Sequence, residues 1–158
     1  MMYTACVITV SDRAANGVYE DKSGPAVAEL LKAQGYQVQD ALIIPDEKNK
    51  IKKALLTYCE QGVHLIITTG GTGFSPRDIT PEATKEVIER EAPGVAEYMR
   101  RKSMEITPRG MLSRATAGIK DRSLIINLPG SPKGAVENLS FILPHLAHGL
   151  DLLILSSN

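Results

Sequence analysis

Residues 63–80 read VHLIITTGGTGFSPRDIT, a run of apolar and β-branched residues that passes into a glycine-rich loop and then into the start of a helix. Residues 63–69 are typical of a buried strand, because the run is short and apolar and is closed by two glycines. Thr80 with Pro81 is typical of a helix N-cap followed by proline at the first helical position. A buried strand, a tight turn and a helix, in that order, form the repeating unit of parallel α/β sheets.

The same alternation extends toward both ends of the chain. Apolar, β-rich runs predict strands at residues 3–10, 38–44, 63–69 and 123–128, and apolar residues at helical spacing predict helices at residues 23–34, 47–61, 80 to about 91, 93 to about 104, and from 131 onward. Pro144 is expected to kink or restart the last of these helices. The pattern predicts an α/β fold in three layers, with a mostly parallel central sheet and helices on both faces.

Length and composition fit a single domain that spans residues 1–158. The hydrophobic fraction is 43% and the charged fraction 23%, which are ordinary values for a globular chain that buries its core without disulfides or a structural metal. Cys6 and Cys59 both lie in apolar patterns, and no CxxC pair or Cys/His cluster indicates a zinc site or a redox motif. We therefore expect two buried, reduced thiols.

The charge balance argues against two classes of partner. The chain has 18 basic and 18 acidic residues, so nothing in its net charge indicates a surface for nucleic acid or for an acidic membrane. The first ten residues lack the pattern of a secretory signal, and no apolar run is long enough to span a bilayer. The sequence predicts a cytoplasmic protein with no nucleic acid or membrane partner.

The glycine-rich loop carries the densest chemical signal. Gly70, Gly71 and Gly73 would let a ligand approach backbone N–H groups closely, and Thr69 and Thr72 add hydroxyls. The loop lacks the GK[ST] ending of a Walker loop and the third glycine of the dinucleotide-binding fingerprint. It is a candidate phosphate cradle, and the alternative is an ordinary turn after a strand.

Two carboxylates are expected close to that loop. Asp78 follows it closely and Asp46 ends the second predicted strand, so both are expected at the carboxyl edge of the sheet, where open α/β sheets bind ligands. Carboxylates beside a phosphate cradle suit Mg²⁺, which makes Asp46 and Asp78 candidate metal ligands and catalytic residues. Each has a structural alternative, with Asp46 as the cap of the helix at residues 47–61 and Asp78 as a cap of the helix near Thr80.

A second loop between a strand and a helix is expected at the same edge. In residues 127–134, NLPGSPKG, Gly130 permits close approach of a ligand and Ser131 begins a helix whose first N–H groups suit an anion. A capped turn accounts for much of the same pattern. The loop at residues 112–115 and the segment after the first strand could also line the crevice. Lysines 48, 50, 52 and 53 are typical of a solvated helix face, although one near Asp46 could touch a phosphate tail.

Six motifs, taken in order, resemble those of a known family. They are VSD at residues 10–12, DKSGP at 21–25, PDE at 45–47, TTGGTGFSPRDITPEAT at 68–84, LSRATAG at 112–118 and INLPGSPKG at 126–134. Over nearly its whole length the chain resembles the MogA/MoaB-type molybdopterin-binding proteins and the equivalent domains of gephyrin and its plant relatives. The GGTG segment with its following acid and TPEAT is the most specific of these motifs.

The resemblance implies a molybdopterin adenylyltransferase of molybdenum cofactor biosynthesis. Such an enzyme transfers AMP from ATP to the terminal phosphate of molybdopterin with Mg²⁺ as cofactor and releases pyrophosphate. It also implies a homotrimer and a molybdenum-inserting partner that receives the product. Gly70, Gly71, Thr72 and Gly73 would cradle phosphate, and Asp46 and Asp78 match the family's essential acids. The remaining candidate binding residues are Ser11, Asp12, Thr69, Ser113, Asn127, Pro129, Gly130 and Ser131.

Two other functions stay open on sequence grounds. A noncatalytic molybdopterin-binding paralogue or carrier protein would keep the pterin site without turning over ATP. A nucleotide hydrolase of the same fold would break down ATP without the pterin. The presence of both Asp46 and Asp78 favours the adenylyltransferase.

Overall fold

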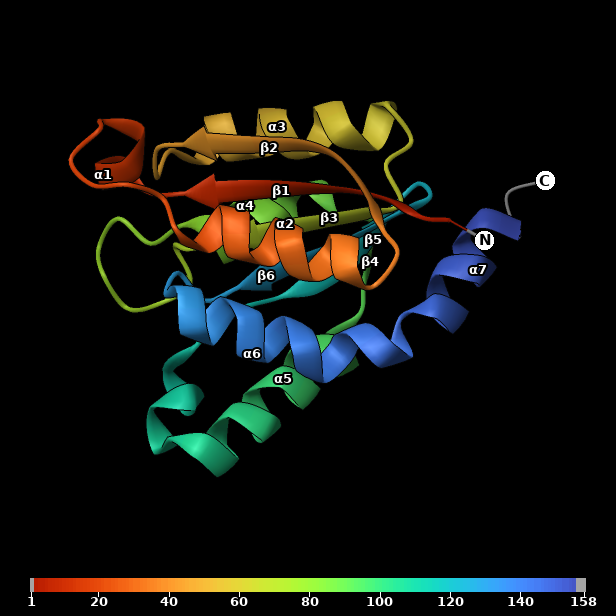
Figure 1. Cartoon of the computed structure of the whole chain (residues 1–158). Coiled ribbons are helices and arrows are strands. Elements are labelled where there is room, and N and C mark those ends of the chain that lie inside the picture. Colours follow the sequence, from red (N-terminus) through yellow and green to blue (C-terminus); the bar gives the residue numbers. More distant parts are fainter. Residues whose placement is uncertain (1, 156–158) are drawn as a thin grey trace.

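The computed structural model describes residues 2–155, in which strands and helices alternate along the chain (Figure 1). All four predicted strands are present, along with two further strands that the sequence pattern did not predict. The elements are β1 (Thr4–Val10), α1 (Asp12–Ala15), α2 (Ser23–Ala33), β2 (Gln37–Ile44), α3 (Lys48–Glu60), β3 (Leu65–Thr69), α4 (Thr80–Val87), β4 (Arg90–Glu91), α5 (Pro93–Ile106), the 3-10 helix η1 (Pro108–Leu112), β5 (Ala117–Lys120), β6 (Ser123–Leu128), α6 (Pro132–Ile142), the 3-10 helix η2 (Leu143–His145) and α7 (Ala147–Leu155).

The strands form a six-stranded sheet in the order β2-β1-β3-β6-β5-β4. The four strands that the sequence predicted, β2, β1, β3 and β6, are all parallel, which confirms the mostly parallel sheet. The two additional strands pair antiparallel, β5 with β6 and β4 with β5. These strands are too short to show a hydrophobic period, which is why the sequence pattern missed them.

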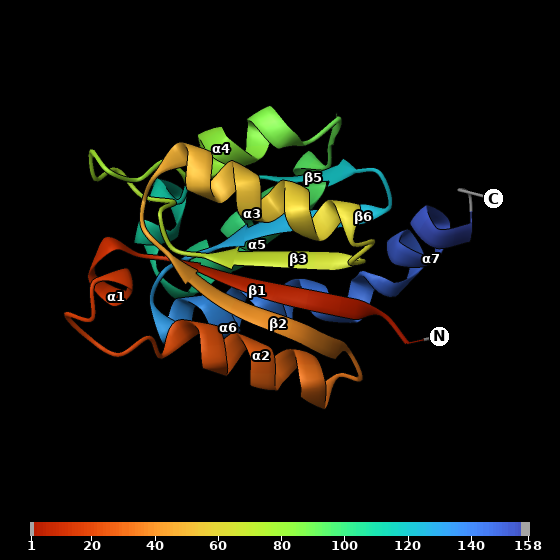
Figure 2. The same ribbon diagram turned by 90° about the horizontal axis from the view of Figure 1, so that it is seen from above.

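Helices cover both faces of this sheet, which confirms the three layers. Figure 2 shows α3 and α4 in front of the sheet and α5 and α6 behind it. Successive residues of a strand point to opposite faces, so β3 contributes Leu65 and Ile67 to the core under α2, α5 and α6, and Ile66 to the core under α3 and α4. Cys6 and Cys59 lie in the second of these cores as free, buried thiols, as expected.

The helix at residue 80 differs from its sequence prediction at both ends. Thr80 is its first residue, and Ile79 is the N-cap, without a side-chain cap bond. The helix ends at Val87 and does not reach residue 91, because the backbone turns into β4 and pairs with β5. The N–H groups of Glu89 and Ala92 donate to the carbonyls of Ile119 and Ala117, at 2.8 and 2.9 Å. Sheet hydrogen bonds therefore replace the last turn of the predicted helix.

The C-terminal helix is interrupted at Pro144, as predicted. Helix α6 ends at Ile142, and η2 carries Pro144 before α7 begins. The hydroxyl of Tyr3 donates to the carboxylate of Asp151, which fastens α7 to the start of β1. Among the described residues, no single helix is long and apolar enough to cross a membrane, and the pair at 132–145 and 147–155 meets that test only as two pieces bent by 61°.

Candidate functional site

The carboxyl ends of β1, β3 and β6 lie side by side and open into one cavity. The register pairs Thr9 with Thr69 and Thr69 with Leu128, so the three strands end at the same level. The cavity has a volume of about 640 Å³, and residues 19–23 form part of its lining. We name it the carboxylate cavity. The predicted site residues that line it are Ser11, Asp46, Thr69, Gly70, Gly71, Asp78 and Gly130.

The glycine-rich loop reaches this cavity in a conformation that other residues rarely adopt. Gly70 and Gly71 have φ angles of 97° and 71°. A Cβ on Gly70 would lie 2.3 Å from the carbonyl oxygen of Val10, and one on Gly71 would lie 2.3 Å from Thr80 Oγ1 and 3.1 Å from Asp46 Oδ1. Only glycine fits at both positions, so backbone rather than side chains forms the cavity wall next to Asp46.

Asp46 is tied to Asp12 by reciprocal hydrogen bonds. The N–H of Asp12 donates to Asp46 Oδ2, and the N–H of Asp46 donates to Asp12 Oδ1, both at 2.9 Å. The proposed capping role of Asp46 is wrong, because the N-cap of α3 is Glu47 and has no side-chain cap bond. Partial burial raises the pKa of Asp46, and the negative charges of Asp12 and Asp78 raise it further. A cation in the cavity would offset both effects.

Arg77, an exposed side chain, forms an ion pair with Asp12. Its Nε and Nη2 each donate to Asp12, to Oδ2 and Oδ1 respectively, at 3.0 Å. The hydrogen bond from Arg77 lowers the pKa of Asp12. The Arg77 side chain is 59% exposed and that of Asp12 is 32% exposed, so the ion pair contributes little to stability. Asp12, a predicted binding residue, thus lies outside the lining of the carboxylate cavity and holds Asp46 in place.

Asp78 lies at the far end of the glycine-rich loop. Its Oδ2 accepts a hydrogen bond from the Ser75 N–H at 3.0 Å, and its own N–H donates to the Ser75 carbonyl at 2.9 Å. A Cβ on Gly73 would lie 3.0 Å from the same Oδ2. The alternative role of Asp78 as a helix cap is wrong, since no side chain caps α4. The carboxylate instead closes the loop and lines the cavity.

The two acids fit a magnesium ion that is held partly by its substrate. Within residues 2–155, no group of three or more His, Cys, Asp or Glu side chains is arranged to hold a metal by itself. Mg²⁺ commonly takes one or two carboxylates and completes its coordination with phosphate oxygens and water. Asp46 and Asp78 line one cavity, and the charge of Asp78 raises the pKa of Asp46, which suits this mode of binding.

A second cavity, of about 330 Å³, adjoins the two loops. A Cβ on Gly130 would lie 3.2 Å from the Cα of Gly70, which shows how closely the loops at 70–73 and 129–131 pack. Ser131 caps α6 as predicted, since its Oγ accepts from the Gly134 N–H at 3.1 Å. Each loop contributes to both cavities, so together they form the wall between them. The predicted site residues in the second cavity are Thr72, Gly73, Ser113, Pro129 and Ser131.

Asn127 differs from the other predicted binding residues, because it lies beneath the site and lines neither cavity. Its side chain is fully buried. The Nδ2 donates to Thr68 Oγ1 and Thr84 Oγ1, both at 3.0 Å, and the Oδ1 accepts from the Thr116 N–H at 3.2 Å. Asn127 therefore joins β3, α4 and Thr116, the residue before β5, and holds these segments together beneath the site.

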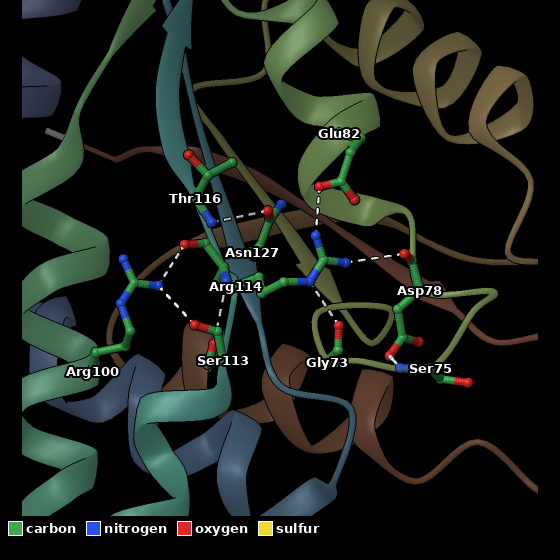
Figure 3. A network of polar contacts seen from close by, with 10 residues as sticks. Gly73, Ser75, Asp78, Glu82, Arg100, Ser113, Arg114, Thr116 and Asn127 are labelled. Carbon is green, nitrogen blue, oxygen red and sulfur yellow. Dashed lines mark hydrogen bonds and ion pairs between the residues drawn. The ribbon is translucent and has the colours of Figure 1, made fainter.

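Arg114 lines neither cavity but holds the glycine-rich loop in place, a role that was not predicted from the sequence. Figure 3 shows its guanidinium between the glycine-rich loop and α4. It donates to the carbonyls of Gly73 and Asp78, at 2.8 and 3.0 Å, and to Glu82 Oε2 at 2.6 Å. Its backbone N–H donates to the Thr72 carbonyl at 2.8 Å. Arg114 belongs to the motif LSRATAG, but the motif alone does not show that its partners are carbonyls so distant in sequence.

These features define a class of protein. Open parallel sheets bind ligands outside the carboxyl ends of their strands, and the site combines a glycine-rich loop, paired carboxylates and two adjoining cavities at that edge. The arrangement is that of an α/β protein that handles phosphorylated ligands.

Comparison with known proteins identifies the family. A family model described as “Probable molybdopterin binding domain” matches residues 6–148. A molybdopterin adenylyltransferase of Helicobacter pylori (strain J99) is 44% identical over 151 residues, which cover 94% of this chain and 86% of that protein. Gephyrin of Dictyostelium discoideum is 41% identical over 157 residues, which cover 93% of this chain and 22% of gephyrin. The crystal structure of the molybdopterin biosynthesis enzyme MoaB from Thermus thermophilus superposes with a TM-score of 0.91, at 45% identity and over 96% of each chain. The chain belongs to the molybdopterin-binding domain family, as its motifs predicted.

Proposed function

We propose that this protein is a molybdopterin adenylyltransferase, which transfers AMP from ATP to the terminal phosphate of molybdopterin. The observation that carries the proposal is the placement of Asp46 and Asp78 beside a glycine-rich loop that separates two cavities. The likeness to molybdopterin adenylyltransferases of Helicobacter pylori and Escherichia coli, at 44% and 43% identity, supports the same activity.

We propose a cavity for each substrate on the basis of charge. The carboxylate cavity suits a nucleotide with its metal, because Asp46 and Asp78 lie in it. Two arginines, Arg100 and Arg109, line the second cavity together with Met99, against one acid, Glu137. Cationic and apolar groups side by side suit a flat pterin that carries a phosphate.

The reaction needs alignment more than covalent chemistry from the protein. An oxygen of the molybdopterin phosphate forms a bond to the α-phosphorus of ATP, and the bond from that phosphorus to the oxygen bridging it to the β-phosphate breaks. The bonding electrons leave with pyrophosphate. The chain must therefore hold two phosphates in line and offset the negative charge that spreads over them. The loop at 70–73 lies between the two cavities, where these phosphates would meet.

We include Mg²⁺ in the proposal, held by Asp46 and Asp78. When bound, the ion would supply positive charge to the phosphate oxygens in the transition state. Thr69 is a further candidate donor, because it is among the residues that line the carboxylate cavity and its buried Oγ1 has no hydrogen-bond partner among the described residues. Asp12 would keep Asp46 oriented through their reciprocal hydrogen bonds.

The assembly and cellular context form a further part of the proposal. On the family resemblance, we infer a cytoplasmic homotrimer that passes the adenylylated pterin to a molybdenum-inserting partner. Light scattering of the purified protein tests the trimer, and a monomer, dimer or hexamer would exclude it. Co-purification of such a partner from cells that make the cofactor tests the transfer.

Pyrophosphate release in the presence of ATP, Mg²⁺ and molybdopterin tests the proposed reaction. Release that depends on the pterin supports an adenylyltransferase. Tight binding of the pterin without release would support a noncatalytic carrier, and breakdown of ATP without the pterin would support a nucleotide hydrolase.

A further inference from the structure

A basic cavity adjoins the carboxylate cavity at Asp46. It has a volume of about 540 Å³ and lies between the start of α3 and the segment at residues 76–79. Asp46 lines both cavities. Lys48, Lys50 and Arg77 line the basic cavity and are absent from the lining of the carboxylate cavity. A ligand that extends past Asp46 would therefore leave the carboxylate cavity and enter the basic cavity.

The two cavities differ in the charges of their linings. Four acidic side chains line the carboxylate cavity against one lysine, whereas three cations line the basic cavity against two acids. A phosphate chain that carries several negative charges needs cationic donors around it. The basic cavity supplies such donors, and the carboxylate cavity has few of its own.

Within residues 2–155, the three cations of the basic cavity are engaged in exposed ion pairs, of which Lys48 with Glu86 at 2.9 Å is one. Arg77 pairs with Asp12 at 3.0 Å, and Lys50 pairs with Glu47 at 3.0 Å. The side chains of Arg77 and Lys50 are 59% and 61% exposed. Exposed pairs of this kind contribute little to stability, so either cation can exchange its partner for a polyanion at small cost.

We propose that the basic cavity holds the pyrophosphate leaving group, with Arg77 and Lys50 as the side chains that bind it; this inference rests on the proposed adenylyl transfer. In-line displacement puts the leaving group on the side of the α-phosphorus away from the attacking phosphate. Gly73 and Ser131 line the second cavity and Asp46 lines the basic cavity, so the two border the carboxylate cavity at different residues. As the bond to the bridging oxygen breaks, its electron pair stays on pyrophosphate, and Arg77 exchanges Asp12 for the pyrophosphate oxygens.

Binding of inorganic pyrophosphate to the full chain, measured by calorimetry with Mg²⁺ present, tests this inference independently of turnover. Arg77→Ala is expected to weaken pyrophosphate binding about tenfold, because it removes a charge-assisted contact, and Lys50→Ala is expected to weaken it by a smaller factor. Lys53→Ala is the matched control. Lys53 is an exposed lysine that lies on α3, as Lys50 does, but outside the basic cavity. AMP, which lacks the leaving group, should bind all three variants as it binds the native protein.

A merely structural role for the Arg77–Asp12 pair gives different results. Asp12→Asn releases Arg77, so our inference predicts unchanged or tighter pyrophosphate binding, whereas a structural role predicts weaker binding in both Asp12→Asn and Arg77→Ala. Equal pyrophosphate affinity in Arg77→Ala and Lys53→Ala, or a parallel loss of AMP affinity in Arg77→Ala, would overturn the inference. Absence of pterin-dependent turnover in the native protein would instead count against the proposed function.

Discussion

Asp46 and Asp12 each accept a hydrogen bond from the backbone N–H of the other, at 2.9 Å in both directions. The contact joins the segments that follow β2 and β1 and holds the Asp46 carboxylate at the cavity. The same arrangement keeps Asp46 partly buried and near two other carboxylates, which raises its pKa. The fold therefore keeps this carboxylate at a cost in stability, which a bound cation would offset.

Asp46→Asn is expected to stabilise the ligand-free protein slightly while abolishing adenylylation. The pKa of Asp46 is raised in the folded state, so the folded protein binds this proton more tightly than the unfolded chain does. The contribution of Asp46 to stability is then lost as the pH rises from the ordinary aspartate pKa through the raised folded value. Asparagine removes that loss, and its side-chain oxygen can still accept from the Asp12 N–H.

Thermal unfolding without Mg²⁺ checks this prediction, with the native protein and Asp46→Asn compared from about pH 3 to pH 7. Asp46 is partly exposed, so the gain at neutral pH should be no more than about 0.5 kcal/mol. The difference should shrink as the pH falls below the aspartate range. An asparagine variant that is clearly less stable than the native protein at pH 7 would disprove the electrostatic account.

Asp78→Asn is expected to keep the fold and the pterin affinity while lowering turnover on the order of a thousandfold. Asparagine can still accept the hydrogen bond from the Ser75 N–H, so the loop remains closed. It loses the negative charge that holds the metal against the phosphate chain. Steady-state kinetics at saturating Mg²⁺, with circular dichroism as the folding control, measures the effect. Near-native turnover would remove Asp78 from the proposed metal site.

Gly71→Ala and Gly17→Ala form a matched pair. Both glycines have positive φ angles, of 71° and 72°, so each alanine carries a similar backbone strain of about 1 kcal/mol. A Cβ on Gly17 meets nothing within 4 Å, whereas one on Gly71 meets Thr80 and Asp46. Urea unfolding should show a further loss of about 1–3 kcal/mol for Gly71→Ala alone. Its ATP affinity should also fall, and equal behaviour of the two variants would contradict the close fit at Gly71.

Arg114→Ala is expected to destabilise the protein by about 2 kcal/mol, because it leaves the carbonyls of Gly73 and Asp78 without their charged donor. The glycine-rich loop should then exchange its amide hydrogens faster, and turnover should fall further than stability alone predicts. Hydrogen exchange over residues 70–79 measures this. Arg101→Ala is the control, since Arg101 is an exposed arginine over the Tyr98 ring. Unchanged exchange in Arg114→Ala would show that the loop is held in another way.

Asn127→Asp separates a structural role from a binding role. The buried Nδ2 donates to two threonine hydroxyls, and aspartate would replace it with a buried charge that lacks donors of its own. We expect a loss of about 3 kcal/mol or more in the free energy of unfolding, measured by urea denaturation. A stable variant with only a raised KM would restore Asn127 to the binding residues.

The sequence predicts the parts of the fold that local patterns determine. Strands β1, β2, β3 and β6 carry apolar runs long enough to identify, and Gly70 with Gly71 marks the loop that needs positive φ angles. Strand β4 forms because long-range pairing with β5 replaces the end of the helix predicted up to residue 91, and β5 is too short to show a hydrophobic period of its own. Both strands could be identified only from their pairing in the three-dimensional structure.

The candidate site shows the same division. Asp46 and Asp78 were identified because they follow strand ends and a glycine-rich loop. Their hydrogen bonds, to Asp12 and Ser75, were not predicted, because the cap rules consider only the neighbouring helix. The role of Arg114 was missed for a related reason. Two of its partners are backbone carbonyls, and since every residue has one, the sequence does not indicate which carbonyls will be bonded.

Transfer of label from ATP to molybdopterin tests the central claim most directly. The native protein would be incubated with Mg²⁺, molybdopterin and ATP labelled at the α-phosphate, and the pterin product would be isolated. Our account predicts label on the pterin, one pyrophosphate released for each AMP transferred, and no transfer by Asp78→Asn above about a thousandth of the native rate. Recovery of unlabelled pterin, with ATP intact or broken down without regard to the pterin, would contradict it.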